Sequence, residues 1–266
     1  MLELTKELLE RSLRQLNIAS GDGLLIHSAI QMLGKPTGGV QAYVSGIQKL
    51  ISEKGTLVVP TFTLDYPRTQ EFDRQKTPSR GMGVLSEFVR QMPGTLRTSH
   101  PLQSVAALGH YAVDLTGRDT SSAFEEGSVF ARMLELDFKL LLLGAEIQAA
   151  SMVHYCEAAV QVPYRRWTEF PGLIWQDGQW VRKTYRMYAR ILEIDPQLKL
   201  QPIQLELERM RAWQEVSLNY GKIACCRLTD FVNACMTLLE KDPWVLVSNK
   251  TEVKHRFALL KEQDGI

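Results

Sequence analysis

The stretch that most constrains the fold is a run of four leucines closed by a glycine, Leu140 to Gly144. Adjacent apolar residues followed by a turn-forming residue predict a buried strand, as in a sheet covered by helices. Ser151, a plausible helix N-cap, comes after a short loop, and the next segment contains His154 and Glu157. Residues three apart share a helix face, so we expect these two side chains to lie together near the C-terminal end of the strand, where open α/β sheets place ligands.

A carboxylate beside an imidazole can hold the ring in one tautomer and stabilise its protonated form, as a general base requires. His154 and Glu157 are therefore the candidate catalytic pair. A core histidine with a satisfied hydrogen bond is an equally open interpretation, and these two residues alone do not decide between them.

The rest of the chain alternates short apolar strands with amphipathic helices. Strands are predicted at 24–28, 56–60, 104–108 and 139–143, and helices at 5–16, 37–54, 84–92 and from 128 onward. A helix between two strands indicates a βαβ unit, so we expect a partly parallel sheet whose strands converge with their C-terminal ends on His154. No repeat, low-complexity tract or linker interrupts the pattern, which indicates one α/β domain over residues 1–266.

Two further regions have their own patterns. Asp65–Thr77 is polar and aperiodic and is interpreted as a surface loop able to cover the site. The aromatic-rich residues 170–200 surround Asp177-Gly178, which predicts a β-hairpin packed on the main sheet. The C-terminal part is predicted as a helix at 206–214, a strand at 223–228, a helix at 231–239 and a strand at 244–247.

Charge and cysteine usage argue against several kinds of partner. The net charge of +1 gives no global field to attract nucleic acid, a membrane or a polycation. The four cysteines show no CxxC and no His/Cys metal spacing, so we expect no metal and no disulfide framework, which fits a reducing cytoplasm. Residues 1–16 are amphipathic and charged, unlike a signal peptide, and no apolar run approaches the ~18 residues of a membrane span.

Several blocks, taken in order, resemble the aminoglycoside 3-N-acetyltransferase family. They are LLIHSAIQMLG at 24–34, TGGV at 37–40, GTLVVPTFT at 55–63, PSRGMGVLSEFVRQMPGTLRTSHPLQSVAALG at 78–109, SSAFEEGSVFARML at 121–134 and the His-x-x-Glu segment. RTSHPLQSVAALG is the most specific, and Ser151 stands where the family pattern has threonine. The resemblance covers residues 5–170 well and continues weakly to about 245. It implies a single three-layer α/β/α domain with a central mixed sheet, distinct from the common N-acetyltransferase fold.

The resemblance also implies acetyl-CoA, or another acyl-CoA, as co-substrate and a small-molecule amine as acceptor. The pantetheine arm is expected along His27, Ser28 and Ala29, where backbone amides would stabilise an oxyanion. Ser79, Arg80 and Gly81 precede a helix and suit a coenzyme A phosphate. Further cofactor contacts are expected at Thr61, Arg97, His100, Ser104, Ser122 and Phe124, and acceptor contacts at Glu146 and Ser151. An ordinary structural role, such as strand-end capping or a helix start, is the alternative for each.

The reaction implied is direct acyl transfer, with His154 as base and Glu157 as its orienting partner. A covalent route through Cys156 is less favoured, because a residue two positions from His154 points to a different face of a helix.

The identity of the acceptor stays open at this point. Aminoglycosides carry several positive charges, and the loop 145–150 offers one carboxylate, Glu146. A biosynthetic acyltransferase acting on another amine therefore competes with an antibiotic-resistance enzyme. A non-catalytic coenzyme A-binding or scaffold protein is a third hypothesis, and a homodimer is a possible assembly.

Overall fold

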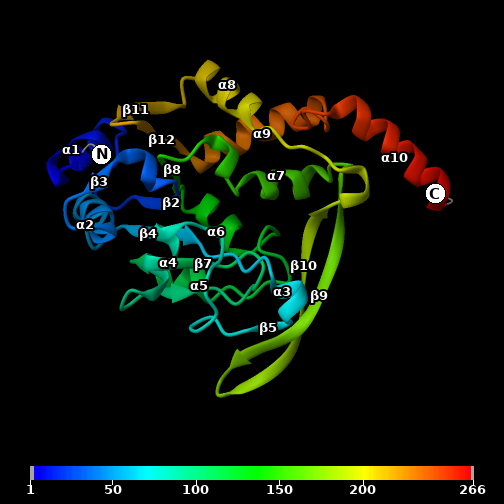
Figure 1. The fold of residues 1–266 in the computed structure, drawn as a ribbon, viewed down its shortest axis with the longest axis horizontal. Coiled ribbons are helices and arrows are strands. Elements are labelled where there is room, and N and C mark those ends of the chain that lie inside the picture. The colour runs from blue at the N-terminus through cyan, green and yellow to red at the C-terminus, as the bar shows by residue number, and fades with distance from the viewer. Residues whose placement is uncertain (1–2, 265–266) are drawn as a thin grey trace.

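The computed structural model describes residues 3–264, which form three layers with a mixed seven-stranded sheet in the middle (Figure 1). The strands lie in the order β11-β12-β8-β2-β4-β7-β6. Their bounds are β2 (Gly23–Ser28), β4 (Thr56–Pro60), β6 (Leu96–Arg97), β7 (Val105–Gly109), β8 (Lys139–Leu143), β11 (Gln214–Leu218) and β12 (Gly221–Arg227). β2 is parallel to β4 and to β8, whereas β7 and β12 run antiparallel to their neighbours. The predicted partly parallel sheet is confirmed.

The two faces of the sheet bury alternate residues of each strand, because successive side chains point to opposite sides. In β2, Leu24 and Ile26 pack into one core and Leu25 into the other. The first core is covered by α1 (Lys6–Gln15), α2 (Val40–Ile51) and α4 (Val84–Gln91). The second is covered by α5 (Ala112–Thr116), α6 (Val129–Glu135), α7 (Val153–Val160) and α9 (Leu228–Lys241), with α8 (Gln201–Arg209) and α10 (Lys250–Asp264) outside them. Two short strands, β1 (Glu3–Leu4) and β3 (Lys35–Pro36), pair separately.

One edge of the sheet positions the candidate site, because the parallel strands β2, β4 and β8 all end there. The chain leaves β8 at this edge and enters α7, which carries His154. The prediction that 104–108 also ends here is wrong. β7 is antiparallel to β4, with Pro60 opposite Val105, so the start of β7, next to Ser104, lies at this edge.

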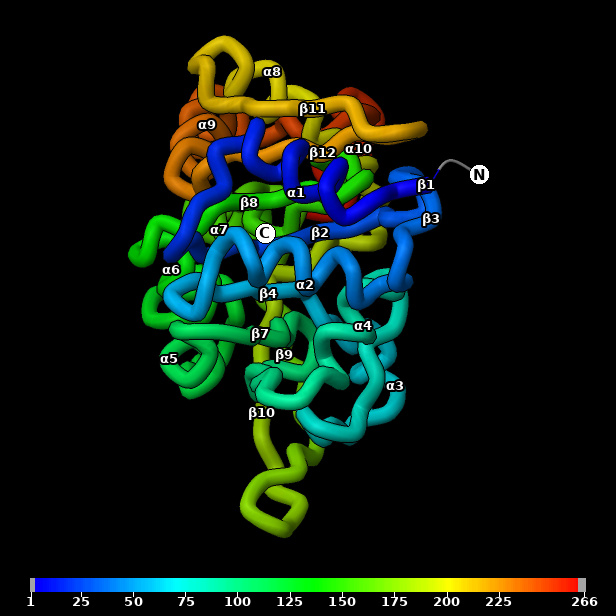
Figure 2. The backbone as a smooth tube through the Cα atoms, turned by 90° about the vertical axis from the view of Figure 1, so that its left-hand side faces the viewer, coloured from blue at the N-terminus to red at the C-terminus, as the bar shows by residue number. Residues whose placement is uncertain are grey.

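The hairpin at Asp177-Gly178 forms as predicted, but it belongs to a separate sheet. β9 (Arg165–Gln176) and β10 (Gln179–Arg190) pair along their whole length, and β5 (Glu71–Phe72) adds a third strand. The hairpin extends well beyond the body of the molecule (Figures 1 and 2). The interpretation of 65–77 as a surface loop is wrong in part: α3 (Tyr66–Thr69) and β5 lie within it, and Tyr66 and Phe72 are buried in a small core against the hairpin.

The C-terminal part differs from the predictions in three places. The helix predicted at 206–214 begins earlier, at Gln201, because Pro202 fits the first turn of α8, and residues 214–218 are strand β11. Residues 244–247 make turns and one bridge between Val247 and Leu198 in place of a strand, and Trp244 packs on Tyr164. α10 is present although no helix was predicted there. Outside the C-terminal part, the helix predicted at 37–54 is the shorter α2.

Candidate active site

The His154 imidazole and the Glu157 carboxylate are joined by a hydrogen bond. Both side chains project from α7, and Nδ1 of His154 lies 2.8 Å from Oε2 of Glu157. Glu157 is completely buried, and the Tyr164 hydroxyl donates to its other oxygen at 3.1 Å. The His154 side chain is 29% exposed. Because Nδ1 is held by the carboxylate, Nε2 is the nitrogen left for a ligand.

Arg165, the first residue of β9, turns inward against this pair. One terminal nitrogen of its guanidinium lies 2.9 Å from Oε2 of Glu157 and 3.2 Å from Nδ1 of His154. Burial and the Arg165 charge lower the pKa of His154, against the opposing effect of Glu157. Burial raises the pKa of Glu157, but Arg165 and His154 outweigh it and the net shift is downward. The imidazole is therefore neutral and the carboxylate ionised near neutral pH.

His27 and Ser151 meet beside the pair. The Ser151 N–H donates to Nε2 of His27 at 3.4 Å, and the Ser151 hydroxyl lies 3.2 Å from the same nitrogen. Burial and the neighbouring His154 lower the pKa of His27 to about 4, so its ring is neutral. The predicted helix-capping role of Ser151 is wrong: α7 begins at Val153, and the Ser151 side chain contacts His27.

Ser28 and Ala29 follow His27 at the end of β2. The Ala29 N–H donates to the Leu143 carbonyl at 2.9 Å, so this amide is already occupied and does not suit an oxyanion. A Cβ placed on Gly83 would lie 3.3 Å from the Ser28 carbonyl oxygen. The loop before α4 therefore passes directly against this strand end.

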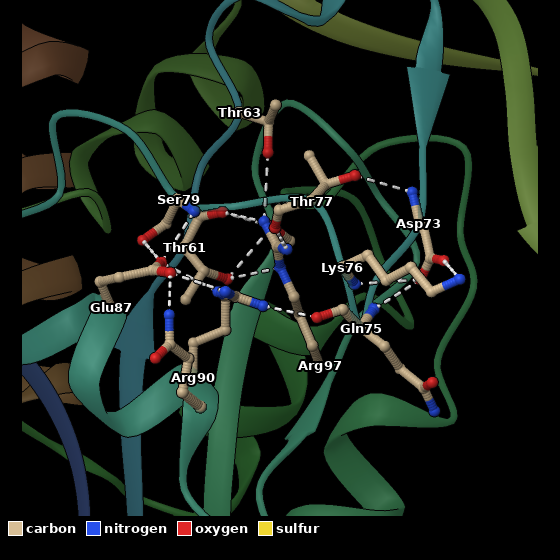
Figure 3. A network of polar contacts seen from close by, with 12 residues as sticks. Thr61, Thr63, Asp73, Gln75, Lys76, Thr77, Ser79, Glu87, Arg90 and Arg97 are labelled. Atoms are coloured by element: carbon tan, nitrogen blue, oxygen red, sulfur yellow. Dashed lines mark hydrogen bonds and ion pairs between the residues drawn. The ribbon is translucent and has the colours of Figure 1, made fainter.

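That loop carries the three residues predicted to meet a phosphate. The N–H and hydroxyl of Ser79 both donate to Glu87 at 2.9 Å, so Ser79 is engaged within the protein (Figure 3). Arg80 has a side chain that is 70% exposed, with Asp65 at 3.7 Å. Gly81 has φ +79°, a backbone that other residues adopt only with strain. Among the three, Arg80 is the residue that offers a charge to an anion.

Arg97, Thr61 and Ser104 form a buried network. The Arg97 Nε lies 3.0 Å from Oγ1 of Thr61 and 3.1 Å from Oγ of Ser104. Its terminal nitrogens donate to the carbonyls of Thr61 and Thr77 at 2.5 Å and to the Thr63 hydroxyl at 3.1 Å (Figure 3). Burial lowers the pKa of Arg97 to about 9. These bonds connect the end of β4 and the start of β7 with the segment before Ser79, and they occupy the polar groups of all three side chains.

His100 connects the main sheet to the hairpin. Its Nδ1 accepts from the Gln103 N–H at 3.2 Å, and its Nε2 lies 3.3 Å from the Arg186 carbonyl oxygen on β10. The ring is buried, which lowers its pKa to about 4, and it packs against the Tyr185 ring at a tilt of 58°, with 4.9 Å between the centroids. Both ring nitrogens therefore have protein partners.

Phe124 is the predicted cofactor residue whose ring contacts His154 of the candidate catalytic pair. Its ring meets the His154 imidazole edge-on, with 5.5 Å between centroids. Ser122 is buried, and its hydroxyl accepts from the Phe124 N–H at 3.3 Å, which fixes the loop that carries the phenylalanine.

Two cavities meet at His154. The smaller, about 150 Å³, is bordered by His27, Ser151 and His154, and the larger, about 780 Å³, lies between His154 and the hairpin. Gln148 borders both, and it also borders a third cavity of about 680 Å³ that contains Glu146. His154 thus stands where a narrow pocket opens into a wider one, and Glu146 borders a different cavity.

Sequence reasoning missed the hairpin's part in the larger cavity. Arg165, Arg166 and Arg190 all border it. The Tyr-Arg-Arg sequence at 164–166, shortly after α7, was the available signal, but which arginine turns inward depends on the pairing of β9 with β10. In that pairing Arg190 lies opposite Arg165 and Ala189 opposite Arg166.

The thiol of Cys156 lies away from these cavities. Cys156 is completely buried, in the second core, with α7 packed on α9. Cys235 on α9 forms a hydrogen bond with Cys156. This bond, and to a smaller extent burial, raises the pKa of Cys235 well above its usual value. The packing supports the interpretation of Cys156 as a core residue.

Within residues 3–264, no group of three or more His, Cys, Asp or Glu side chains could hold a metal ion. None of the helices described is both long and apolar enough to cross a membrane.

Comparison with known proteins agrees with the geometry. The family described as aminoglycoside 3-N-acetyltransferase matches residues 25–240. An aminoglycoside N(3)-acetyltransferase III from Salmonella sp is 30% identical over 206 residues, covering 69% of this chain and 71% of the relative. An aminoglycoside N(3)-acetyltransferase VII from Streptomyces paromomycinus is 29% identical over 210 residues, covering 72% and 71%.

Solved structures share the fold. The binary complex of AAC-IIIb with coenzyme A superimposes with a TM-score of 0.81 at 23% identity, covering 90% of this chain and 97% of that one. AAC-VIa bound to sisomicin gives a TM-score of 0.81 at 23% identity, covering 90% and 98%. The predicted fold and the predicted enzyme class, an acyltransferase, are confirmed. The chain belongs to the aminoglycoside 3-N-acetyltransferase family.

Proposed function

We propose that this protein transfers an acyl group from an acyl-coenzyme A, with acetyl-CoA as the first candidate, to a primary amine, and that His154 is the general base. The observation that carries the proposal is the 2.8 Å bond between Nδ1 of His154 and Glu157. It holds one ring nitrogen and leaves the other at the junction of two cavities. The relatives named above are N-acetyltransferases, and one related structure contains coenzyme A.

In the proposed step the amine nitrogen attacks the thioester carbonyl, a C–N bond forms and the C–S bond breaks. Nε2 of His154 takes the proton that the amine loses, and coenzyme A leaves as a thiolate that is then protonated by solvent. A neutral imidazole is needed, and burial together with Arg165 lowers the pKa of His154 in that direction. The Glu157 carboxylate then stabilises the imidazolium that results.

The coenzyme would contact the loop before α4 and the end of β2. Arg80 is proposed to bind a phosphate, and the pantetheine arm is proposed to run past Ser28 towards His154. Thr61, Arg97 and Ser104 would act indirectly, by fixing this edge through the bonds they make to one another. A cytoplasmic location and a homodimer remain predictions from the sequence.

Release of free thiol from acetyl-CoA tests the proposal. Amine-dependent thiol release is expected, together with coenzyme A binding measured by calorimetry. If coenzyme A bound but no amine in a broad panel released thiol, the non-catalytic alternative would replace the proposal. The intact hydrogen-bonded pair favours the enzyme, because a scaffold has no need of a histidine held in one tautomer.

A further inference from the structure

We infer that the acceptor amine carries an anionic group, a carboxylate or a phosphate, which Arg190 binds while the amine faces His154. The inference rests on the proposed function and names its substrate class. Both residues border the cavity of about 780 Å³ beneath the hairpin. A molecule that fills this space would therefore contact the base and the guanidinium at once.

Among the three arginines that border the cavity, Arg190 is the one whose guanidinium has no partner within residues 3–264. The residue is exposed, and its backbone pairs with Arg165, but its side chain makes no hydrogen bond or ion pair in that range. Its charge is close enough to lower the pKa of His154. Arg165, by contrast, is buried and paired with Glu157, and Arg166 is paired with Glu193 at 2.6 Å.

The charges around the cavity do not balance. Three guanidinium groups, from Arg165, Arg166 and Arg190, face two carboxylates, Glu157 and Glu193, which leaves one positive charge in excess. Moreover, Arg190 lies directly opposite Arg165 in the strand pairing, and like charges in that position repel. An anion bound at Arg190 would relieve the repulsion, and a guanidinium matches a carboxylate or a phosphate bidentately.

A second group in the cavity lacks a partner and suits the other end of such a molecule. Gln103 borders the cavity and is 4% exposed, yet its buried Oε1 accepts no hydrogen bond from the described residues. Buried polar atoms are nearly always paired, so this oxygen points to a missing donor. The N–H of an incoming amine would supply it. Apolar side chains such as Phe62 and Phe170 also border the cavity and would contact a short carbon chain between amine and anion.

A polycationic acceptor fits this cavity poorly. Each buried positive charge needs a compensating carboxylate, and Asp65, Asp73 and Glu146 are engaged with other groups or border a different cavity. Asp65 pairs with Arg68 and Arg80, and Asp73 accepts backbone N–H groups of its own turn. Glu146 borders a different cavity. An amine with one positive charge and one negative charge avoids the free-energy cost of burying several uncompensated positive charges.

The test uses acceptors that differ only in the remote group. The carboxylate series is γ-aminobutyrate, its carboxamide and the matching diamine putrescine, and the phosphate series is phosphoethanolamine with ethanolamine. Kanamycin represents the polycations. We expect kcat/KM for the better anionic acceptor to exceed that of its neutral partner at least tenfold, with putrescine and kanamycin lowest. The series with the larger ratio identifies the anion.

Two variants assign the effect to the cavity. Arg190→Gln is expected to raise KM for the anionic acceptor about tenfold, to leave kcat within about twofold and to abolish the preference over the neutral partner. Arg182→Gln is the matched control. It changes an exposed arginine on the same strand, about 26 Å away at ~3.3 Å per residue, and should change neither constant. Equal unfolding midpoints would show that both variants fold.

A binding measurement separates this inference from the proposed function. Calorimetry of the products N-acetyl-γ-aminobutyrate and N-acetylethanolamine phosphate, against their neutral counterparts, needs no turnover. Tighter binding of an anionic product than of its neutral counterpart, with that difference lost in Arg190→Gln, supports the inference even if no thiol is released. The absence of thiol release would count only against the proposed function. Equal binding in both series, or a kanamycin kcat/KM above that of every anionic amine, would overturn the inference.

Discussion

The Arg165 guanidinium and the Glu157 carboxylate form an ion pair 2.9 Å long beside the His154 imidazole, with side chains that are 6% and 0% exposed. The carboxylate is thereby shared between a permanent cation and the candidate base. Such a buried pair is sensitive to loss of one partner, because the remaining charge has no water around it.

Replacing Arg165 should change both the stability of the protein and the pKa of its base. In Arg165→Met the buried Glu157 keeps only His154 and Tyr164 as partners, so the free energy of unfolding should fall by about 3–5 kcal/mol. The guanidinium now lowers the pKa of His154, so its removal should raise that pKa. Because the neutral ring is the active form, the acid limb of the pH profile of kcat/KM should move to higher pH. Arg166→Met, at the exposed neighbouring position, is the control, and an unmoved acid limb in Arg165→Met would contradict the assignment.

The stability of the protein should fall as the pH drops below that of an ordinary histidine. The pKa of both His27 and His100 is about 4 in the fold, against a usual value of about 6.5. The unfolded chain therefore binds protons first, and stability present above about pH 6.5 is lost between there and about pH 4, by up to about 1.4 kcal/mol per pH unit for each histidine. Urea unfolding near pH 7.5 and near pH 4.5 measures the loss. His100→Asn, which cannot be protonated, should flatten it, and a variant as steep as the wild type would contradict the account.

Two arginines near the proposed coenzyme site should have separable effects. Arg97→Gln removes the donors to five carbonyl and hydroxyl oxygens in a buried network, so it should lower the free energy of unfolding by about 2–4 kcal/mol. Arg80→Gln, at an exposed position, should leave stability nearly unchanged and weaken coenzyme A binding about tenfold, less so at high salt. Chemical denaturation measures the free energy of unfolding of both variants, and calorimetry measures their affinity for coenzyme A. Undiminished coenzyme A affinity in Arg80→Gln would remove that residue from the proposed site.

Cys156→Ala should retain turnover close to the wild-type value. The thiol is buried and packed towards α9, away from the cavities at His154. Direct transfer also leaves no acyl group on the protein, so mass spectrometry after mixing with acetyl-CoA alone should find the unmodified chain. An acylated Cys156 peptide, or a turnover reduced more than a hundredfold in a folded variant, would instead favour the covalent route.

The contact between His154 and Glu157 could be predicted because it is local: three residues of spacing on one helix bring the two side chains together. The strands β2, β4 and β8 could be predicted from their apolar runs. The direction of β7 could not, because the long connection from Pro60 to Val105 allows either orientation. The roles of Arg165 and Arg190 also escaped prediction, since they depend on where β9 and β10 lie relative to α7.

The thiol-release rate of His154→Ala tests the central claim most directly. Loss of a general base costs about a hundredfold to ten-thousandfold in rate, so kcat with the best acceptor should fall by that factor. Coenzyme A affinity and the unfolding midpoint should stay close to wild type, because the His154 side chain is partly exposed and borders the cavities. His154→Gln, which keeps the side-chain volume and a polar end, should be equally slow. Wild-type turnover in either folded variant would contradict the assignment of His154 as the base.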